Sequence, residues 1–193
     1  MPDAPWRDVS TVPDPRRRVP ADPVAQGPDA DAESVARKIL LDQLTGQART
    51  RSELAGKLAK KGVPTEIAEP LLDRFEEVGL VDDSAFAREW VQSRQAGRGL
   101  ARRALAQELR RKGVTDEVAR EALDEVDPED EVASARVLVQ RKLRSVASLE
   151  RTVQVRRLTG MLARKGYSSG VAIRVVREEL EAVGQESDDL FEG

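Results

Sequence analysis

Cysteine and histidine are absent from this chain of 193 residues. Their absence excludes disulfide bonds, thiolate nucleophiles, imidazole bases and the common zinc sites, which depend on these two side chains. Aromatic residues make up only 3% of the sequence, although 39% of all residues are hydrophobic. We therefore expect a thin, mainly aliphatic core that is spread along the length of the molecule.

Long apolar runs and catalytic motifs are missing as well. No apolar run approaches the roughly 20 residues of a membrane-spanning helix, and the N-terminus has no secretory hydrophobic segment. Gly97-Arg98-Gly99 is too short for a phosphate-binding loop, and the pairs Asp82-Asp83 and Asp188-Asp189 read more simply as a helix N-cap and a solvated tail. We expect a cytoplasmic protein without membrane contact, catalytic activity, metal or other cofactor.

One type of helix ending occurs three times. Gly62, Gly113 and Gly166 lie 51 and 53 positions apart, and each has a leucine four positions before it and a large apolar residue directly after it. Glycine adopts the left-handed conformation at the end of a helix without steric cost, so the next residue can fold back onto the last turn in a Schellman cap. The pairs that should touch are Leu58 with Val63, Leu109 with Val114, and Leu162 with Tyr167.

The near-constant spacing of these caps predicts a repeat architecture. Each repeat contains three segments in which apolar residues follow helical spacing. No segment alternates apolar and polar residues for long enough to predict a β-strand. We expect an all-α fold, an elongated tandem array of three three-helix repeats that pack mainly on their neighbours. The repeats should span 32–80, 81–126 and 127–184, between a disordered Pro/Asp-rich N-terminal arm over 1–31 and an acidic tail over 185–193.

Helix-start signals support the same register. Thr50 with Glu53 forms a predicted capping box, and Asp82, Thr115 and Ser168 are predicted N-caps. Thr115 and Ser168 stand two positions after a cap glycine, as Pro64 does in the first repeat. The repeat is therefore marked both where its second helix ends and where its third helix begins.

Three residues need separate comment. Pro70 lies inside the third predicted helix, and we expect it to kink that helix or delay its start. Phe86 and Trp90 are four positions apart in a chain with few aromatic residues. This spacing favours two core residues on one helix face over a platform for stacking nucleic-acid bases.

Charge is unevenly distributed, although the net charge is only −3. Acidic residues gather on the third helix of the predicted repeats, and basic residues gather on the second helix and the loop before it. Cations at the end of a helix gain about 0.3–1 kcal/mol from the helix dipole, so basic residues there need no function. The dipole repels cations at the start of a helix, and the cations found there indicate a surface for a polyanion or an acidic protein. They are Arg98, Arg102, Arg103, Arg151, Arg156 and Arg157.

The middle repeat carries a longer motif. Residues 79–91 read Gly-Leu-Val-Asp-Asp-Ser-Ala-Phe-Ala-Arg-Glu-Trp-Val and are followed by Arg94, Gly97-Arg98-Gly99 and the segment 105–114. In this pattern the chain resembles the RecX family of regulatory proteins, over about residues 34–181. The outer repeats match through their caps and apolar spacing. The long arm and Leu100, where relatives often have proline, depart from the family pattern.

The resemblance implies a non-enzymatic regulator of the RecA recombinase. Such a protein lies along the groove of the RecA filament on single-stranded DNA and suppresses ATP hydrolysis, strand exchange and the coprotease role of the filament. Many weak contacts along a helical groove add up by multivalency. We expect a monomer whose partners are the RecA filament and single- or double-stranded DNA. The residues expected to contact them are Arg88, Arg94, Arg98, Arg102, Arg103, Arg110, Arg111, Lys112, Arg141, Lys142, Arg144, Arg156 and Arg157.

Two other functions fit the same residues. The chain could bind DNA directly through helix-turn-helix-like pairs formed by the second and third helices of a repeat. It could also be a scaffold that binds an acidic protein through its basic face, without any nucleic acid. Charge placement alone does not separate the cations that contact protein from those that contact phosphate.

Overall fold

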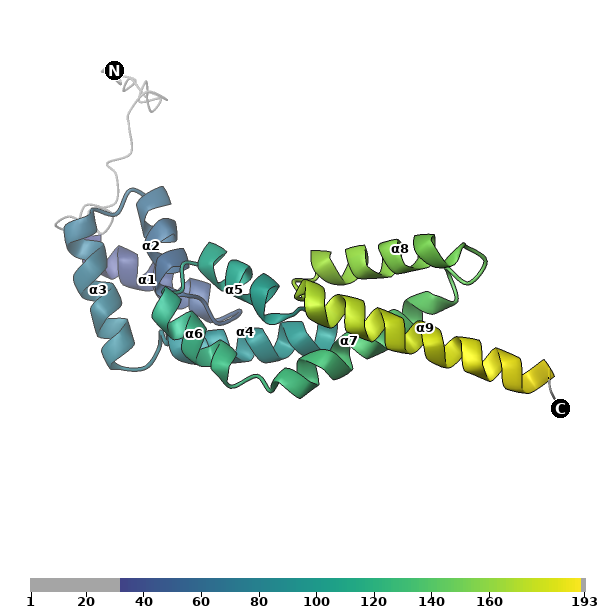
Figure 1. Cartoon of the computed structure of the whole chain (residues 1–193). Helices are drawn as coiled ribbons and strands as arrows, with labels where there is room; N and C mark the ends of the chain where they lie inside the picture. Colours follow the sequence, from purple (N-terminus) through teal and green to yellow (C-terminus); the bar gives the residue numbers. More distant parts are fainter. Residues whose placement is uncertain (1–31, 192–193) are drawn as a thin grey trace, which may run out of the picture.

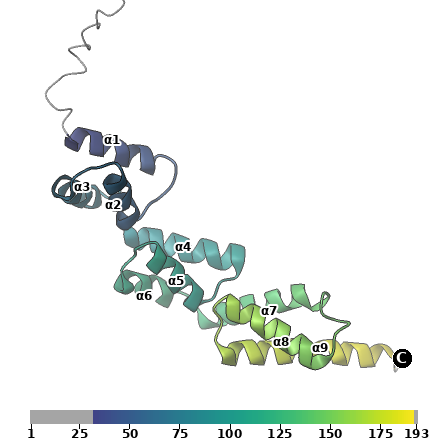
Figure 2. The same ribbon diagram turned by 90° about the horizontal axis from the view of Figure 1, so that it is seen from above.

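The computed structural model describes residues 32–191, with side chains up to Gly184, and the expected arm over 1–31 lies outside this range. Within it the chain forms nine helices and no strand. The helices build an elongated, stepped array, with the first helix near one end and the last helix at the other (Figures 1 and 2). This arrangement confirms the predicted all-α array of three three-helix repeats.

Each repeat contributes three consecutive helices. They are α1 (Ala32–Leu44), α2 (Arg51–Lys60) and α3 (Thr65–Glu77) in the first repeat, α4 (Asp83–Arg98), α5 (Arg102–Arg111) and α6 (Asp116–Asp124) in the second, and α7 (Pro128–Leu143), α8 (Arg151–Arg164) and α9 (Ser169–Phe191) in the third. In every repeat the first helix packs on the third. No helix within residues 32–191 is long and apolar enough to cross a bilayer.

The C-terminal helix is longer than expected. α9 continues to Phe191, so Gln185 does not begin a separate acidic tail. The physical reason is that neither proline nor glycine occurs between Gly184 and Gly193, and nothing else in this stretch breaks a helix. The stretch expected to be an acidic tail is therefore helical as far as Phe191, and its exposure to solvent stays a prediction.

The core consists of aliphatic side chains from the inner faces of the helices. Buried residues form three clusters that follow the three repeats along the chain. The second helix of each repeat supplies two leucines, four positions apart, that are completely shielded from solvent. These pairs are Leu54 and Leu58, Leu105 and Leu109, and Leu158 and Leu162.

The three predicted helix caps are present. Gly62, Gly113 and Gly166 have φ angles of 76°, 79° and 92°. In each cap the residue after the glycine donates its backbone N–H to the carbonyl of the predicted leucine, with N···O distances of 3.1, 3.1 and 3.2 Å. Gly79 (φ 71°) forms a further cap of the same type at the end of α3, which the sequence analysis missed although Phe75 stands at the same spacing as the leucines.

The predicted N-caps are also confirmed, but the capping box is only half formed, because the Glu53 carboxylate binds Lys112 and not the Thr50 N–H. The side chains of Thr50, Asp82, Thr115 and Ser168 each accept a backbone N–H three residues further on. The expectation that Pro70 delays α3 is wrong, because α3 already begins at Thr65, directly after an extended N-cap residue. The expected kink stays a prediction.

The second helices of successive repeats meet end to end, through two equivalent joints. In the first joint, the Thr50 hydroxyl at the start of α2 donates to the Lys112 carbonyl at the end of α5, at 2.6 Å. In the second, the Ala101 N–H at the start of α5 donates to the Lys165 carbonyl at the end of α8, at 2.9 Å. The row α2, α5, α8 is visible along the upper edge of Figure 1.

The following repeat supplies an acid to each joint. The backbone N–H of Arg51 donates to Asp83 of α4, and that of Arg102 donates to Glu131 of α7, at 2.9 and 3.1 Å. Both N–H groups belong to the first residue of a helix, where no intrahelical acceptor exists. A carboxylate from the next repeat therefore caps the second helix of the repeat before it.

The cap glycines fit closely against these joints. A Cβ at Gly113 would lie 2.1 Å from the Ser52 Oγ, and one at Gly166 would lie 2.5 Å from the Ala104 backbone nitrogen. Gly62 has nothing within 4 Å of the same position, since no helix end meets its cap. Two of the three caps thus need glycine both for their φ angle and for the contact with the neighbouring repeat.

We expect Gly113→Ala to destabilise the protein more than the matched Gly62→Ala. Both substitutions place alanine in the left-handed region, at a cost of about 1–2 kcal/mol. Only Gly113→Ala also overpacks against Ser52, which adds about 1–3 kcal/mol. Urea unfolding followed by circular dichroism measures both values, and adding Ser52→Gly should relieve the extra loss. Equal losses for the two alanine variants would show that the joint tolerates the methyl group.

Candidate binding surface

The row of second helices carries most of the unbalanced positive charge. α2, α5 and α8 hold 10, 10 and 14 residues, or roughly 50 Å of helix at 1.5 Å per residue. α8 contains four arginines and no carboxylate, and α2 and α5 contain one glutamate each. α3 and α6 are acidic, with a single arginine apiece. The predicted segregation of charge by helix is therefore present.

We call the exposed cations of these three helices, apart from Arg151 at the start of α8, the basic ridge. They are Lys57, Lys60, Arg103, Arg110, Arg111, Arg156, Arg157 and Arg164. Five of the eight were predicted from the sequence as contact residues. Lys57, Lys60 and Arg164, which lie in the last turns of their helices, were not.

Seven of the thirteen predicted contact residues are exposed and make no ion pair with any residue in 32–184. They are Arg88, Arg103, Arg141, Lys142, Arg144, Arg156 and Arg157. Arg103, Arg156 and Arg157 belong to the basic ridge, and the other four lie on α4 and at the end of α7. A cation without an internal partner keeps its full charge for an external anion.

Four more predicted residues make ion pairs at the surface. Arg98 and Arg111 lie 3.9 and 4.0 Å from Glu108, Arg110 lies 2.9 Å from Asp116, and Arg102 binds Asp124. Exposed pairs of this kind are worth at most about 1 kcal/mol and weaken with salt. Arg98, Arg110 and Arg111 remain mostly exposed, so this pairing does not remove them from the surface.

Arg94 and Lys112 have a structural role and are taken out of the proposed surface. The Arg94 guanidinium carbon lies 4.0 Å from the centre of the Trp90 ring, and the Lys112 Nζ lies 4.7 Å from it. Lys112 also pairs with Glu53 across the first joint, at 2.7 Å. Both cations are thus engaged by aromatic and acidic neighbours inside the protein.

The aromatic pair beneath these cations is part of the core, as predicted. The Phe86 and Trp90 rings stack with their centres 5.5 Å apart, and Phe86 is buried. The Trp90 indole N–H donates to Glu108 at 3.0 Å. A ring covered by Arg94 and Lys112 is not available to stack a base.

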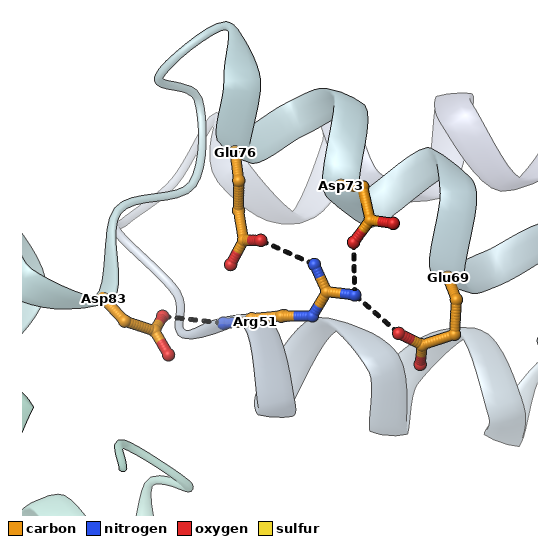
Figure 3. A network of polar contacts seen from close by, with 5 residues as sticks. All are labelled: Arg51, Glu69, Asp73, Glu76 and Asp83. Carbon is orange, nitrogen blue, oxygen red and sulfur yellow. Dashed lines mark hydrogen bonds and ion pairs between the residues drawn. The ribbon is translucent and has the colours of Figure 1, made fainter. Parts of the chain in front are cut away.

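Arg51, which was not predicted from the sequence, is the most highly coordinated cation in the described part of the chain. Its guanidinium binds the carboxylates of Glu69, Asp73 and Glu76 on α3, at 2.5, 2.7 and 2.6 Å (Figure 3). Burial alone lowers the pKa of this guanidinium, but the hydrogen bonds that it donates to the three carboxylates outweigh this effect and raise the pKa above its ordinary value. The spacing of these three acids, i, i+4 and i+7, placed them on one helix face and was the available signal.

Arg51 explains why two other arginines stand at the start of a helix. Arg51, Arg102 and Arg151 are the first residues of α2, α5 and α8. Each reaches the third helix of its own repeat, since Arg102 binds Asp124 of α6 and Arg151 donates to the Leu180 carbonyl of α9. A cation in the first helical position is therefore a repeated structural feature here. The unfavourable dipole position of Arg102 and Arg151 therefore does not by itself indicate an external ligand, and a binding role of Arg102 stays a prediction. Arg98, also expected at a helix start, is the last residue of α4, where the dipole favours a cation.

Three family models match the three repeats in order. The match is to the first three-helix domain of RecX over residues 36–75, the second over 82–123 and the third over 129–176. Together these ranges cover more than half of the chain. The chain belongs to the RecX family. This confirms the resemblance inferred from residues 79–114.

Named RecX relatives are similar over most of their length. A protein of Streptomyces lividans named regulatory protein RecX is 53% identical over 171 residues, which are 89% of this chain and 86% of that protein. The regulatory protein RecX of Thermobifida fusca is 55% identical over 153 residues, 79% of this chain and 83% of the relative. A role as a RecX regulatory protein follows from this family membership.

Solved RecX structures share the fold. The crystal structure of RecX from Lactobacillus salivarius superimposes with a TM-score of 0.73 at 20% identity, over 78% of this chain and 97% of that one. A second crystal structure, of a regulatory protein RecX, gives a TM-score of 0.69 at 28% identity, over 75% and 72% of the two chains. The stacked three-helix repeats are therefore shared with known RecX structures.

In this RecX-family chain, we expect Arg51→Gln to lower the free energy of unfolding by about 1–2 kcal/mol, because three carboxylates of α3 lose their common partner. Arg74→Gln is the matched control, since Arg74 is exposed and lies 3.9 Å from Glu77; its effect should stay within about 0.5 kcal/mol. Urea unfolding at low and at 1 M salt measures both. Equal effects of the two variants would contradict the structural role of Arg51.

Proposed function

We propose that this protein binds the RecA filament on single-stranded DNA and restrains its ATP hydrolysis, strand exchange and coprotease activity, without catalysing a reaction itself. The observation that carries the proposal is the basic ridge, whose cations follow three helices joined end to end. Its relatives named regulatory protein RecX support a regulatory role, and the ridge suggests how a nucleoprotein filament would be engaged.

The ridge suits an extended polyanion better than a compact one. Its cations are distributed over roughly 50 Å of helix, so only a long ligand meets all of them at once. Each cation that neutralises a phosphate releases counterions, and several such contacts together give strong binding at low salt. Because the joints hold the helices in place, little ordering is needed when the ligand binds, and this favours affinity.

The direct test is RecA ATP hydrolysis on single-stranded DNA with the protein at substoichiometric amounts. We expect inhibition, since one regulator on a filament contacts several RecA protomers and blocks more than one of them. Strand exchange and cleavage of a coprotease substrate should fall in parallel. Unchanged ATP hydrolysis at equimolar protein would overturn the proposal.

Charge reversal on the ridge should weaken this inhibition. We expect Arg103→Glu combined with Arg156→Glu to raise the concentration for half-inhibition about tenfold or more, because two favourable contacts become repulsive, and tenfold corresponds to about 1.4 kcal/mol. The melting temperature should hardly change, since neither arginine pairs with a described residue. Arg120→Glu is the matched control, because Arg120 is an exposed arginine on the acidic α6 and pairs with none of the described residues. Equal inhibition by the parent, the double variant and Arg120→Glu would show that the basic ridge takes no part in inhibition.

Direct DNA binding is the competing explanation, favoured by the absence of any carboxylate from α8. It predicts tight binding of naked single-stranded DNA, with a steep loss of affinity as salt is added. Inhibition that persists when RecA is replaced by an unrelated DNA-dependent ATPase would support it. Inhibition that is specific to RecA supports the proposed function.

A further inference from the structure

A cleft opens between the second and third repeats, on α4 and α7. Its volume is about 790 Å³, and it lies between the C-terminal part of α4 and the side of α7. Gly97, Arg98 and Gly99 form part of its wall, so it includes the motif that was too short for a phosphate-binding loop. It lies apart from the exposed cations of the basic ridge.

Three cations line this cleft. Arg141 is exposed and makes no ion pair with a described residue, and Arg98 has only the distant contact with Glu108. Lys165 donates from its Nζ to the Arg98 carbonyl, which holds the ammonium group at the cleft wall. Asp130 is the one carboxylate among the lining residues that the structure describes. The cleft thus has a surplus of positive charge.

The cleft also has an apolar side. Val137 of α7 is 44% exposed, although most other aliphatic residues of α7 are buried or half-buried, and Leu138 lies next to it. Leu100 and two alanines extend this apolar surface. No aromatic ring occurs among the lining residues, so a nucleic-acid base would find nothing to stack on.

Glycine geometry indicates that the cleft is formed before any ligand binds. Gly99 has a φ of 57°, and a Cβ there would lie 2.9 Å from a methyl carbon of Leu138, so the end of α4 lies directly against α7. The Tyr167 hydroxyl, itself buried, donates to the Gly99 carbonyl at 3.1 Å and fixes the same segment. Gly97, in contrast, faces open space within 4 Å.

We propose that this cleft docks an acidic segment of a partner protein. An aliphatic side chain of the segment rests on Val137 and Leu138, and flanking carboxylates bind Arg98, Arg141 and Lys165. The combination of apolar surface and converging cations is typical of peptide recognition, and a sugar-phosphate backbone would leave the apolar part unused. The inference rests on the proposed function, under which the partner is RecA: the cleft contacts RecA protein, and the ridge contacts DNA.

Two substitutions test the cleft without touching the core. Gly97→Glu places a carboxylate in open space on a helix, and Arg141→Glu reverses an exposed, unpaired charge. The matched controls are Gly170→Glu, at another helical glycine with nothing within 4 Å, and Arg120→Glu, at an exposed arginine of α6 that lies outside the cleft and was not predicted to bind. Circular dichroism melting checks that all four full-length variants are folded.

Each protein is titrated against RecA filaments assembled on a dT oligonucleotide and, separately, against the same oligonucleotide without RecA. We expect Gly97→Glu and Arg141→Glu to bind filaments about tenfold more weakly, a change of about 1.4 kcal/mol. Their binding of the naked oligonucleotide should match the parent, and both controls should match the parent throughout.

Each other outcome counts against the inference. Filament binding like that of the parent would show that the cleft takes no part in docking. Equal loss of filament and naked-oligonucleotide binding would show that it contacts nucleic acid. If the parent protein itself fails to bind filaments and leaves ATP hydrolysis unchanged, the proposed function fails, and the RecA assignment of the cleft fails with it.

Discussion

The end-to-end joint between second helices is the interaction on which the rest of this structure depends. A glycine cap ends one helix, and its exposed carbonyl accepts a hydrogen bond from the start of the helix before it, at Lys112 with Thr50 and at Lys165 with Ala101. The negative end of one helix dipole thereby faces the positive end of the next. This contact stacks the repeats and brings the basic helices together in one row. Close to the second joint, the end of α4 lies against α7. The fold, the basic ridge and the cleft therefore all depend on these joints.

The sequence predicted the parts of the fold that depend on local chemistry. The caps, N-caps and helix order all follow from residues a few positions apart, and the structure confirms them. The contact of Gly113 with Ser52 could not be predicted in this way, because it joins residues from different repeats whose packing the local pattern does not specify. The length of α9 was misjudged for the opposite reason: acidic composition indicated a solvated tail, although no residue in it ends a helix.

The distribution of charge in the sequence predicted which helices are basic, but it predicted the roles of single residues less well. The contrast between α8, without carboxylates, and the acidic α3 and α6 is visible in the sequence and remains in the structure. Cations at the ends and at the starts of helices can be distinguished in the sequence. In all three repeats, however, the first residue of the second helix is an arginine that binds the third helix of its own repeat. Arg103, Arg156 and Arg157 make no ion pair within the described part of the chain and stay candidates for the binding surface. The cleft could not be predicted, because its walls come from two repeats.

The joint links the length of a helix to the direction in which the next repeat faces. Within each helix, one residue advances the chain by 1.5 Å and turns it by about 100°. One residue inserted into α5 after Arg103 would therefore rotate the third repeat about the axis of α5, relative to the first repeat, as well as shift it. Arg103, Arg156 and Arg157 would then face a different direction from Lys57 and Lys60 of α2. The lengths of the short middle helices set the direction in which every downstream charge faces, and so they are part of the binding surface even where their own side chains touch nothing.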